Sequence, residues 1–482
     1  MISFCFAVAI LIAGYFIYGK FAERIFGIDR HRQTPAYSMT DNVDYVPMSW
    51  WRIFLIQFLN IAGLGPIFGA IMGMMFGPAA FLWIVFGTVF GGAVHDYFSG
   101  MMSVRSGGAS LPELNGKELG IAAKQFMRIF SLLLMILVGA VFISGPAGLL
   151  AGITQNYISV FWWTVIVFGY YILATLLPID KLIGRIYPLF GAVLLFMAVG
   201  ILCALFVNSA PIPEITDGLA NRHPEGLPIF PMMFVSIACG AISGFHATQS
   251  PMMARCLKNE KYGRRCFYGA MVAEGILALI WAAAAASFFG SVDGLQDYAA
   301  SLPENSNTGA EVVNTVSKTW LGTFGGLLAL LGVVAAPITS GDTALRSARL
   351  IAADFLHVNQ KRLSKRLLVA VPVFALTFII LFFVPFGVLW RYFAWCNQTL
   401  AVFTLWAITV YLCRNGKNYF ISLIPALFMT AVTSTYIFAA PEGFGLGIAL
   451  SNIFGFAITV FTGILFVRYR NRLMKTKIMS CS

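Results

Sequence analysis

The sequence predicts an all-α integral membrane protein with about thirteen transmembrane helices, its amino terminus outside and its carboxyl terminus inside. Of the 482 residues, 59% are hydrophobic and only 11% are charged, whereas soluble domains carry roughly 25% charged residues. Apolar runs of about 18 or more residues recur along the chain, and each can span about 30 Å of hydrocarbon as a helix. The distribution of Lys and Arg between alternate loops is the third observation.

The apolar runs define the predicted spans in order along the chain. The first run has no basic residue before it, and its first positive charge, Lys20, follows the apolar stretch, so we expect a retained helix and not a cleaved signal. The spans are centred on residues 1–19, 51–75, 78–103, 126–150, 160–177, 187–208, 229–251, 268–290, 320–341, 366–386, 388–413, 418–438 and 446–467.

The basic residues test this count, because Lys and Arg of short loops stay on the cytoplasmic side. With the amino terminus outside, all of the 32 Lys and Arg residues except Arg222, Lys318 and Arg391 fall in inner segments or at inner span edges. An odd number of spans is therefore expected. The net charge of +12 then reflects cytoplasmic loops beside anionic membrane lipid, and nucleic acid is not an expected partner.

The chain lacks the motifs of several other classes. Its eight cysteines include no CxxC pair, and most fall within or beside spans, where a free cysteine acts as a small hydrophobe. There is no Walker loop, HExxH or GxSxG motif, which argues against an ATP-driven pump or a membrane hydrolase. We expect no enzyme activity, no cofactor and no disulfide.

The second span contains residues that break helices. In the stretch NIAGLGPIFGAIMGMMFGP, the cluster Gly63, Gly65 and Pro66 would free backbone N–H and C=O groups at mid-span, and these cost several kcal/mol each unless protein, water or ligand satisfies them. A binding cavity is the expected reason. The glycines at every fourth position from 65 to 77 could alternatively serve only close helix packing.

The seventh span, which contains SIACGAISGFHATQSP, is interrupted near residues 240–251. It runs opposite to the second span, and paired breaks in oppositely oriented halves are typical of secondary transporters with inverted repeats. We predict repeats at 51–208 and 229–413, with the substrate between the breaks. An accessory helix (1–25) would precede them, and two accessory helices (418–467) and a basic cytoplasmic tail (468–482) would follow.

A few polar residues inside the spans are functional candidates, because a mid-bilayer charge costs roughly 2.5–3.5 kcal/mol on insertion scales. His95 and Asp96 share a glycine-lined helix and suggest a proton-sensitive site, or else a structural hydrogen-bonded pair. His246 is expected to line the cavity, or else to be a satisfied core histidine. Glu274 could couple an ion, or could extend toward the basic loop that precedes it.

Oxygen ligands gather at the predicted cytoplasmic end of the ninth span, in APITSGDTALRSAR. Thr339, Ser340, Asp342 and Thr343 are the kind of groups that hold a sodium ion, with Thr339, Ser340 and Asp342 as the candidate site, and Asp342 could instead carry a proton. The alternative is an N-cap at Ser340 or Asp342 that starts an interfacial helix.

Four long stretches resemble the carbon-starvation protein A family. They are GPIFGAIMGMMFGPAAFLWIVFGTVFGGAVHDYFSGMMSVRSGGASLPEL, FVSIACGAISGFHATQSPMMARCL, TSGDTALRSARL and LWRYFAWCNQTLA, and the resemblance extends from about residue 35 to about residue 413. It implies a bacterial or archaeal cytoplasmic-membrane carrier linked to nutrient scavenging, with proton-coupled pyruvate or small peptides as substrates. It also implies the two five-helix inverted repeats of the amino acid–polyamine–cation carriers. The chain is shorter than the longest members.

The leading hypothesis is a secondary active importer of a small carboxylate such as pyruvate, or of short peptides, by cation symport with H⁺ or Na⁺. An uncoupled channel and a membrane nutrient sensor are the alternatives. The residues expected to bind substrate are Gly63, Gly65, Pro66, Gly244, His246, Gln249, Ser250, Asn397 and Gln398. Those expected to couple the ion are His95, Asp96, Glu274, Thr339, Ser340, Asp342 and Thr343.

Overall fold

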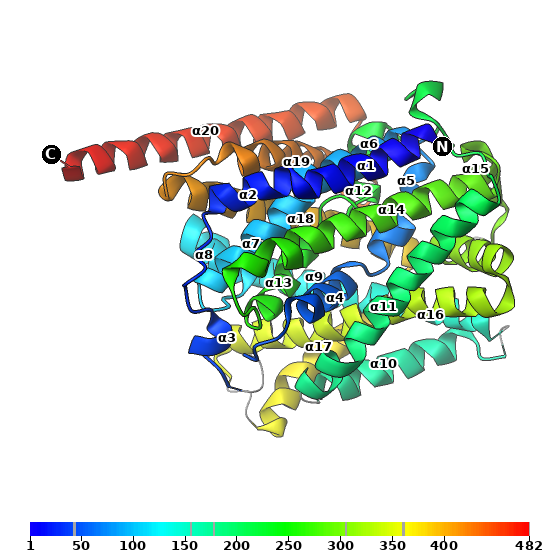
Figure 1. The fold of residues 1–482 in the computed structure, drawn as a ribbon, viewed down its shortest axis with the longest axis horizontal. Helices are drawn as coiled ribbons and strands as arrows, with labels where there is room; N and C mark the ends of the chain where they lie inside the picture. Colours follow the sequence, from blue (N-terminus) through cyan, green and yellow to red (C-terminus); the bar gives the residue numbers. More distant parts are fainter. Residues whose placement is uncertain (42–44, 155–156, 177–178, 304–305, 359–361, 482) are drawn as a thin grey trace.

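The computed structural model describes residues 1–41, 45–154, 157–176, 179–303, 306–358 and 362–481, and helices make up most of them (Figure 1). The first half of the chain contains α1 (Ile2–Phe16), α2 (Tyr18–Phe26), α3 (Pro35–Ser38), α4 (Trp50–Ile61), α5 (Ala70–Met74), α6 (Ala79–Phe86), α7 (Ala93–Arg105), α8 (Leu111–Leu119), α9 (Ile121–Ile153), α10 (Val160–Leu176) and α11 (Ile179–Val207).

The second half contains α12 (Phe234–Ser236), α13 (Gly244–Ala254), α14 (Gly269–Phe288), α15 (Val292–Ser301), α16 (Thr308–Phe355), α17 (Leu363–Phe383), α18 (Phe386–Arg414), α19 (Phe420–Ala439) and α20 (Ile448–Cys481). Short π-helical turns occur at Gly65–Gly69, Gly87–Gly92, Ile229–Met233 and Arg264–Tyr268, and 3₁₀ turns at Ile215–Asp217 and Glu260–Tyr262. The described residues form no strand beyond one isolated bridge between Met48 and Leu257.

Ten helices in the described part of the chain are long and apolar enough to cross a membrane. The pair Trp50–Ile61 and Gly65–Met74, bent by 56°, makes an eleventh if it is one span. Two predicted spans do not meet this measure alone: Val160–Ala174 is a shorter apolar helix, and the seventh predicted span is divided into short helices. The prediction of an all-helical membrane protein is confirmed, with ten or eleven candidate spans. The total of thirteen spans stays a prediction.

Two predicted boundaries differ from the structure. α16 continues without interruption past residue 341 to Phe355, because the residues after the polar cluster are good helix formers, so the N-cap that was the alternative for Ser340 or Asp342 is wrong. α20 continues through most of the predicted tail, to Cys481. Residues 177 and 482, where two predicted segments end, lie outside the described residues.

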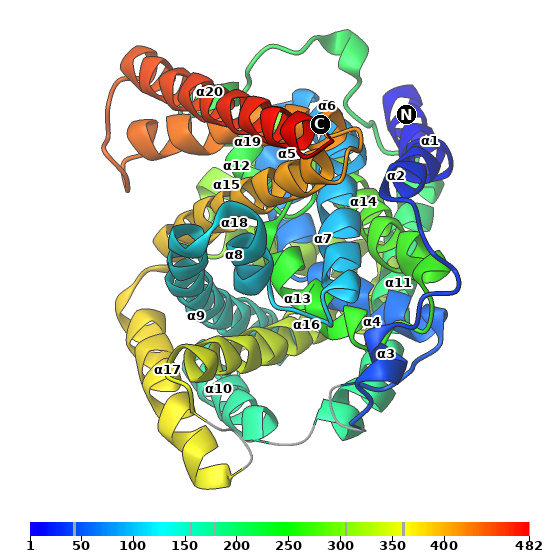
Figure 2. The ribbon, with the colours of Figure 1, turned by 90° about the vertical axis from the view of Figure 1, so that its left-hand side faces the viewer.

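The helices surround a buried centre. α13 lies near the middle of the bundle in both views, with α20 and α1 toward one side and α10 and α17 toward the opposite side (Figures 1 and 2). The amino-terminal end of α1 and the carboxyl-terminal end of α20 lie at opposite ends of the bundle (Figure 1). Long helices of the periphery therefore enclose the short helices that flank the two interruptions.

Candidate functional site

The first interruption lies where the sequence predicts it. α4 ends at Ile61, and Ala62 leaves the helical region with φ −78° and ψ 52°. The chain resumes as the π-helical turn Gly65–Gly69 and then as α5. π-helical turns often occur at functional sites, and the bend of 56° exposes backbone groups that the rest of the fold must satisfy.

The glycines after this break allow close contact with the second interruption. A Cβ added to Gly65 would lie 2.2 Å from Cβ of Cys239, and one added to Gly73 would lie 2.1 Å from Cγ1 of Ile237. The close packing expected of this stripe is present, and its partner is the second broken span. Gly77 does not continue the stripe, because it has φ +98° and lies beside Arg222.

The second interruption occupies residues 237–243, between α12 and α13, which is earlier than the predicted 240–251. Ser243 is extended, with φ −141° and ψ 122°, and α13 then runs from Gly244 through Pro251 to Ala254. Gly244 permits this start because an added Cβ would lie 2.4 Å from the backbone nitrogen of Ala401. His246, Gln249 and Ser250 therefore lie on a helix and not within the break.

Asn397, on α18, satisfies the polar groups at the start of α13. Its Oδ1 accepts hydrogen bonds from the backbone N–H of Phe245 at 2.7 Å and from Oγ of Ser243 at 3.0 Å. Its Nδ2 donates to Sγ of Cys239 at 3.1 Å. The neighbouring Gln398 donates from Nε2 to the carbonyl of Phe234 at 2.6 Å. These contacts act as a cap that a distant helix supplies to α13.

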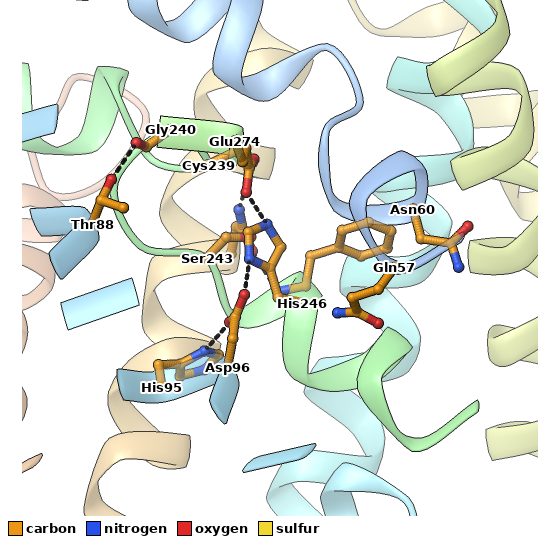
Figure 3. A network of polar contacts seen from close by, with 12 residues as sticks. Gln57, Asn60, Thr88, His95, Asp96, Cys239, Gly240, Ser243, His246 and Glu274 are labelled. Carbon is orange, nitrogen blue, oxygen red and sulfur yellow. Dashed lines mark hydrogen bonds and ion pairs between the residues drawn. The ribbon is translucent and has the colours of Figure 1, made fainter. Parts of the chain in front are cut away.

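A continuous chain of four buried titratable side chains crosses this region (Figure 3). Nδ1 of His95 lies 2.8 Å from Oδ1 of Asp96, and Nδ1 of His246 lies 2.9 Å from Oδ2 of the same carboxylate. Nε2 of His246 lies 3.4 Å from Oε2 of Glu274. All four side chains have no exposed surface. These four side chains thus connect α7, α13 and α14.

The contacts of these four side chains bear on two alternatives left open by the sequence. Glu274 does not extend toward the basic loop, because its carboxylate is buried against His246. His95 and Asp96 are not an isolated pair, because Asp96 also contacts His246. The glycines preceding them allow this approach: a Cβ on Gly92 would lie 2.3 Å from the carbonyl of Ala241, in the second break.

The oxygen-rich residues of α16 lie beside the first break, and their hydroxyls donate to backbone carbonyls. Ser340 Oγ bonds the carbonyls of Leu59 and Asn60, at 3.1 and 3.0 Å. Thr339 donates within its own helix, to the carbonyls of residues 335 and 336, and Thr343 donates to the carbonyl of Ser340. Oδ2 of Asp342 lies 3.6 Å from Nη2 of Arg346.

Two further findings concern ligands. Among the described residues, no group of three or more His, Cys, Asp and Glu side chains could hold a metal ion. A cavity of about 410 Å³ lies between α10 and α17 and not at the breaks, with lining residues such as Phe168, Ile172 and Phe374. Because its lining is apolar and the polar chain lies elsewhere, we do not assign the transport site to it.

Sequence reasoning missed several polar residues of this region. Gln57 and Asn60 are fully buried on α4, just before the first break, and Thr88 donates to the carbonyl of Gly240 at 3.1 Å. Two amides three positions apart within an apolar span were the available signal, because side chains at that spacing share a helix face.

Two interrupted helices that meet at a buried polar cluster within an all-helical membrane bundle are an arrangement typical of membrane transporters. Comparison with solved structures finds a similar fold. One match is the crystal structure of the Eremococcus coleocola manganese transporter in complex with an aromatic bis-isothiourea substituted compound. The superposition covers 90% of the present protein and 99% of the transporter chain, with a TM-score of 0.51 and 14% sequence identity. At this identity the likeness shows a shared fold.

The sequence matches the family described as carbon starvation protein CstA over residues 1–162, 152–320 and 307–436. The chain therefore belongs to this family, which is a family of transporters and not of enzymes. The predicted resemblance is confirmed.

Individual relatives are named for different functions, or for none. An "Uncharacterized membrane protein" of Haemophilus influenzae is 49% identical over 347 residues, which are 62% of this chain and 94% of the relative. A "Peptide transporter CstA" of Bacillus subtilis is 30% identical over 58% of this chain and 57% of the relative. A "Pyruvate/proton symporter BtsT" of Escherichia coli is 26% identical over 57% of this chain and 47% of the relative. The chain thus spans about half the length of the relatives named for a substrate.

Proposed function

We propose that the protein is a secondary active transporter that imports a small carboxylate such as pyruvate, or a short peptide, together with a proton across a bacterial or archaeal cytoplasmic membrane. This substrate range is supported by two relatives, one named a peptide transporter and the other a pyruvate/proton symporter. The proposal includes thirteen spans, an outer amino terminus and an inner carboxyl terminus. It also includes two inverted repeats, 51–208 and 229–413, each beginning with a broken helix.

One observation carries the proposal: the buried chain of His95, Asp96, His246 and Glu274 lies where the second break packs against α7 and α14. A carboxylate faces each ring nitrogen of His246, Asp96 within hydrogen-bond distance of Nδ1 and Glu274 at 3.4 Å from Nε2, and an imidazole carries a proton on both nitrogens only when it is protonated. No lysine or arginine forms an ion pair with Asp96 or Glu274 among the described residues. The cluster therefore depends on bound protons to offset its negative charge.

This arrangement couples protonation to movement of the broken helix. With both carboxylates ionised, one protonated histidine leaves a net negative charge, and one further proton makes the cluster neutral. An unbalanced charge in a low-dielectric interior is costly, so adding or removing that proton changes the energy of holding α13 against α7 and α14. A pH gradient can thereby drive α13 between two arrangements and, with it, alternating access to the substrate.

The geometry favours a proton over a sodium ion. Ser340 and Thr339 bond backbone carbonyls, and Asp342 lies beside the guanidinium of Arg346, whose positive charge would repel a cation.

Uptake into proteoliposomes of the purified protein tests the proposal. We expect labelled pyruvate or dialanine to accumulate under an imposed pH gradient and not under a sodium gradient. Asp96→Asn and Glu274→Gln should abolish accumulation while retaining counterflow exchange of the same substrate. The exposed carboxylate of Glu113, on α8, provides the control Glu113→Gln, which should accumulate normally. Accumulation by Asp96→Asn at the wild-type level, or flux without any accumulation by the wild type, would contradict proton coupling.

A further inference from the structure

The apolar cavity between α10 and α17 lies outside the proton chain and at the edge of the bundle. Its volume of about 410 Å³ is within the range of ligand pockets, roughly 300–1,000 Å³. Phe168 and Ile172 line it from α10, and its lining on α17 extends from Leu367 to Ile379. Leu367 and Ile379 are exposed, and both helices lie at the periphery in both views (Figures 1 and 2). The cavity therefore faces the surroundings of the bundle, which in a membrane protein are lipid.

The cavity is long enough for one hydrocarbon chain. Residues 367–379 cover about 18 Å of α17 at 1.5 Å per residue, and one leaflet of the hydrocarbon core is about 15 Å thick. The ring of Phe168 lies 5.7 Å from that of Phe374 and forms part of the wall. Beyond this stretch, the rings of Phe161 and Phe382 meet at 5.9 Å. Because an apolar cavity does not retain water, hydrocarbon is the expected occupant.

Positive charge adjoins the cavity at its other end, beside Leu367. Arg366 directly precedes Leu367 and lies four residues before Ala370, another lining residue, so it is on the same face of α17. Lys365 is exposed beside it. The sequence has no Asp or Glu in residues 355–441. The positive charge at this end is thus not offset by any acidic residue of α17 itself.

The start of α17 favours an anion for a second reason. Lys365 and Arg366 are in the first turn of the helix, which has no acidic residue, and cations at this end oppose the helix dipole. The N-cap, Arg362, makes no side-chain cap hydrogen bond in the described part of the chain. A phosphate group would compensate both the basic side chains and the positive end of the helix. The cavity therefore combines a place for hydrocarbon with a place for an anion at one end.

We propose that this cavity binds an anionic phospholipid, with one acyl chain along residues 367–379 and the phosphate beside Lys365 and Arg366. Basic pockets between transmembrane helices are typical sites for anionic headgroups. The ligand would also cover an exposed helix, because only 28% of the most apolar window of α17 is buried inside the protein. In the proposed topology the headgroup lies in the cytoplasmic leaflet. The site itself does not depend on which substrate is transported.

Native mass spectrometry of the full chain, purified in detergent, tests this site. The probes are phosphatidylglycerol and phosphatidylcholine with the same palmitoyl and oleoyl chains, added in equal amounts. We expect at least about fivefold more phosphatidylglycerol to remain bound, since each Lys or Arg near an anionic surface contributes roughly a fivefold preference. Inorganic phosphate should not displace it, because the acyl chain supplies most of the binding. This comparison uses the wild-type protein and does not depend on a variant that folds.

Variants then locate the site. Lys365→Gln combined with Arg366→Gln should abolish the preference for phosphatidylglycerol, while Ala375→Trp, which fills the cavity, should lower the retention of both lipids at least about fivefold. Two matched controls should retain both lipids as the wild type does. Arg24→Gln removes an exposed basic residue of α2, and Ala457→Trp adds the same bulk at an exposed position of α20.

Three results would overturn the inference. Equal retention of the two lipids by the wild type would show only general contact with the bilayer. Displacement of phosphatidylglycerol by inorganic phosphate would indicate a site for a free anion. Unchanged retention in Ala375→Trp would show that the lipid lies elsewhere. Transport activity is not measured in any of these experiments, so the proposed function is left standing whichever result is found.

Discussion

At the scale of single residues, Gly65 lies at one of the close contacts between the two discontinuous helices. A methyl group at this position would lie 2.2 Å from Cβ and 2.4 Å from Sγ of Cys239, and Cβ atoms do not approach this closely. The contact also explains why a glycine follows the first break directly. Any larger side chain would separate the two breaks and disturb the buried polar chain behind them.

Gly65→Ala should therefore lower the free energy of unfolding of the purified transporter by about 1–3 kcal/mol, because the added methyl group overpacks the contact. The matched control is Gly148→Ala in α9, where an added Cβ meets nothing within 4 Å, and helix propensity predicts an unchanged or slightly higher stability. The measurement is thermal unfolding in detergent. A second change, Cys239→Gly, should restore part of the loss in Gly65→Ala, and equal stability of Gly65→Ala and the wild type would refute the contact.

For His246, the sequence predicted a functional position but not the neighbouring residues. Its place in an interrupted span indicated a functional role, and the sequence assigned it to the substrate. The structure brings it between Asp96 and Glu274, two carboxylates from other helices, so our proposal assigns it to proton coupling. No local pattern could have paired these residues, because 150 positions separate Asp96 from His246.

At the scale of elements, the short helix α13 depends on groups from other helices. A helix of eleven residues is marginal in isolation, and its first turn leaves N–H groups without helical partners. Asn397 on α18 accepts one of these N–H groups and one hydroxyl, and it donates to Cys239. The break and its cap therefore come from separate parts of the sequence.

Asn397→Ala should remove both accepted hydrogen bonds and destabilise the start of α13 by about 1–3 kcal/mol. Amide hydrogen exchange, followed by mass spectrometry, should become faster for residues 243–247 and remain unchanged in α19. The control Asn115→Ala removes an amide that bonds the carbonyl of Leu111 within its own helix. Exchange in α13 that is the same in Asn397→Ala and wild type would show that the cap is not needed.

At the scale of the whole molecule, the amino and carboxyl termini lie at opposite ends of the bundle (Figure 1), and the proposed thirteen crossings would place them on opposite sides of the membrane. The distribution of Lys and Arg predicts which end faces the cytoplasm. Glu225 lies in the loop between α11 and α12, and Asn418 lies between α18 and α19. The proposed topology places the first outside and the second inside.

Cysteine labelling in intact cells measures this orientation. In a variant whose native cysteines are replaced, Glu225→Cys should react with a membrane-impermeant maleimide, and Asn418→Cys should react only after permeabilisation. Both residues are exposed in the structure, so burial would not account for a missing reaction. Labelling of both positions from the outside would contradict the topology with thirteen spans.

The sequence by itself determined the membrane class, the approximate helices, the family and the existence of two breaks. These depend on composition, on the length of apolar runs and on Gly and Pro, all of which act locally along the chain. The tertiary structure decided that Gly65 and Gly73 face the second broken span, that Glu274 turns inward and that α16 continues past Ser340. It also brought Gln57 and Asn60 to the first break as buried amides. These features depend on which helices pack together, and burial then makes each unpaired polar group costly enough to define a site.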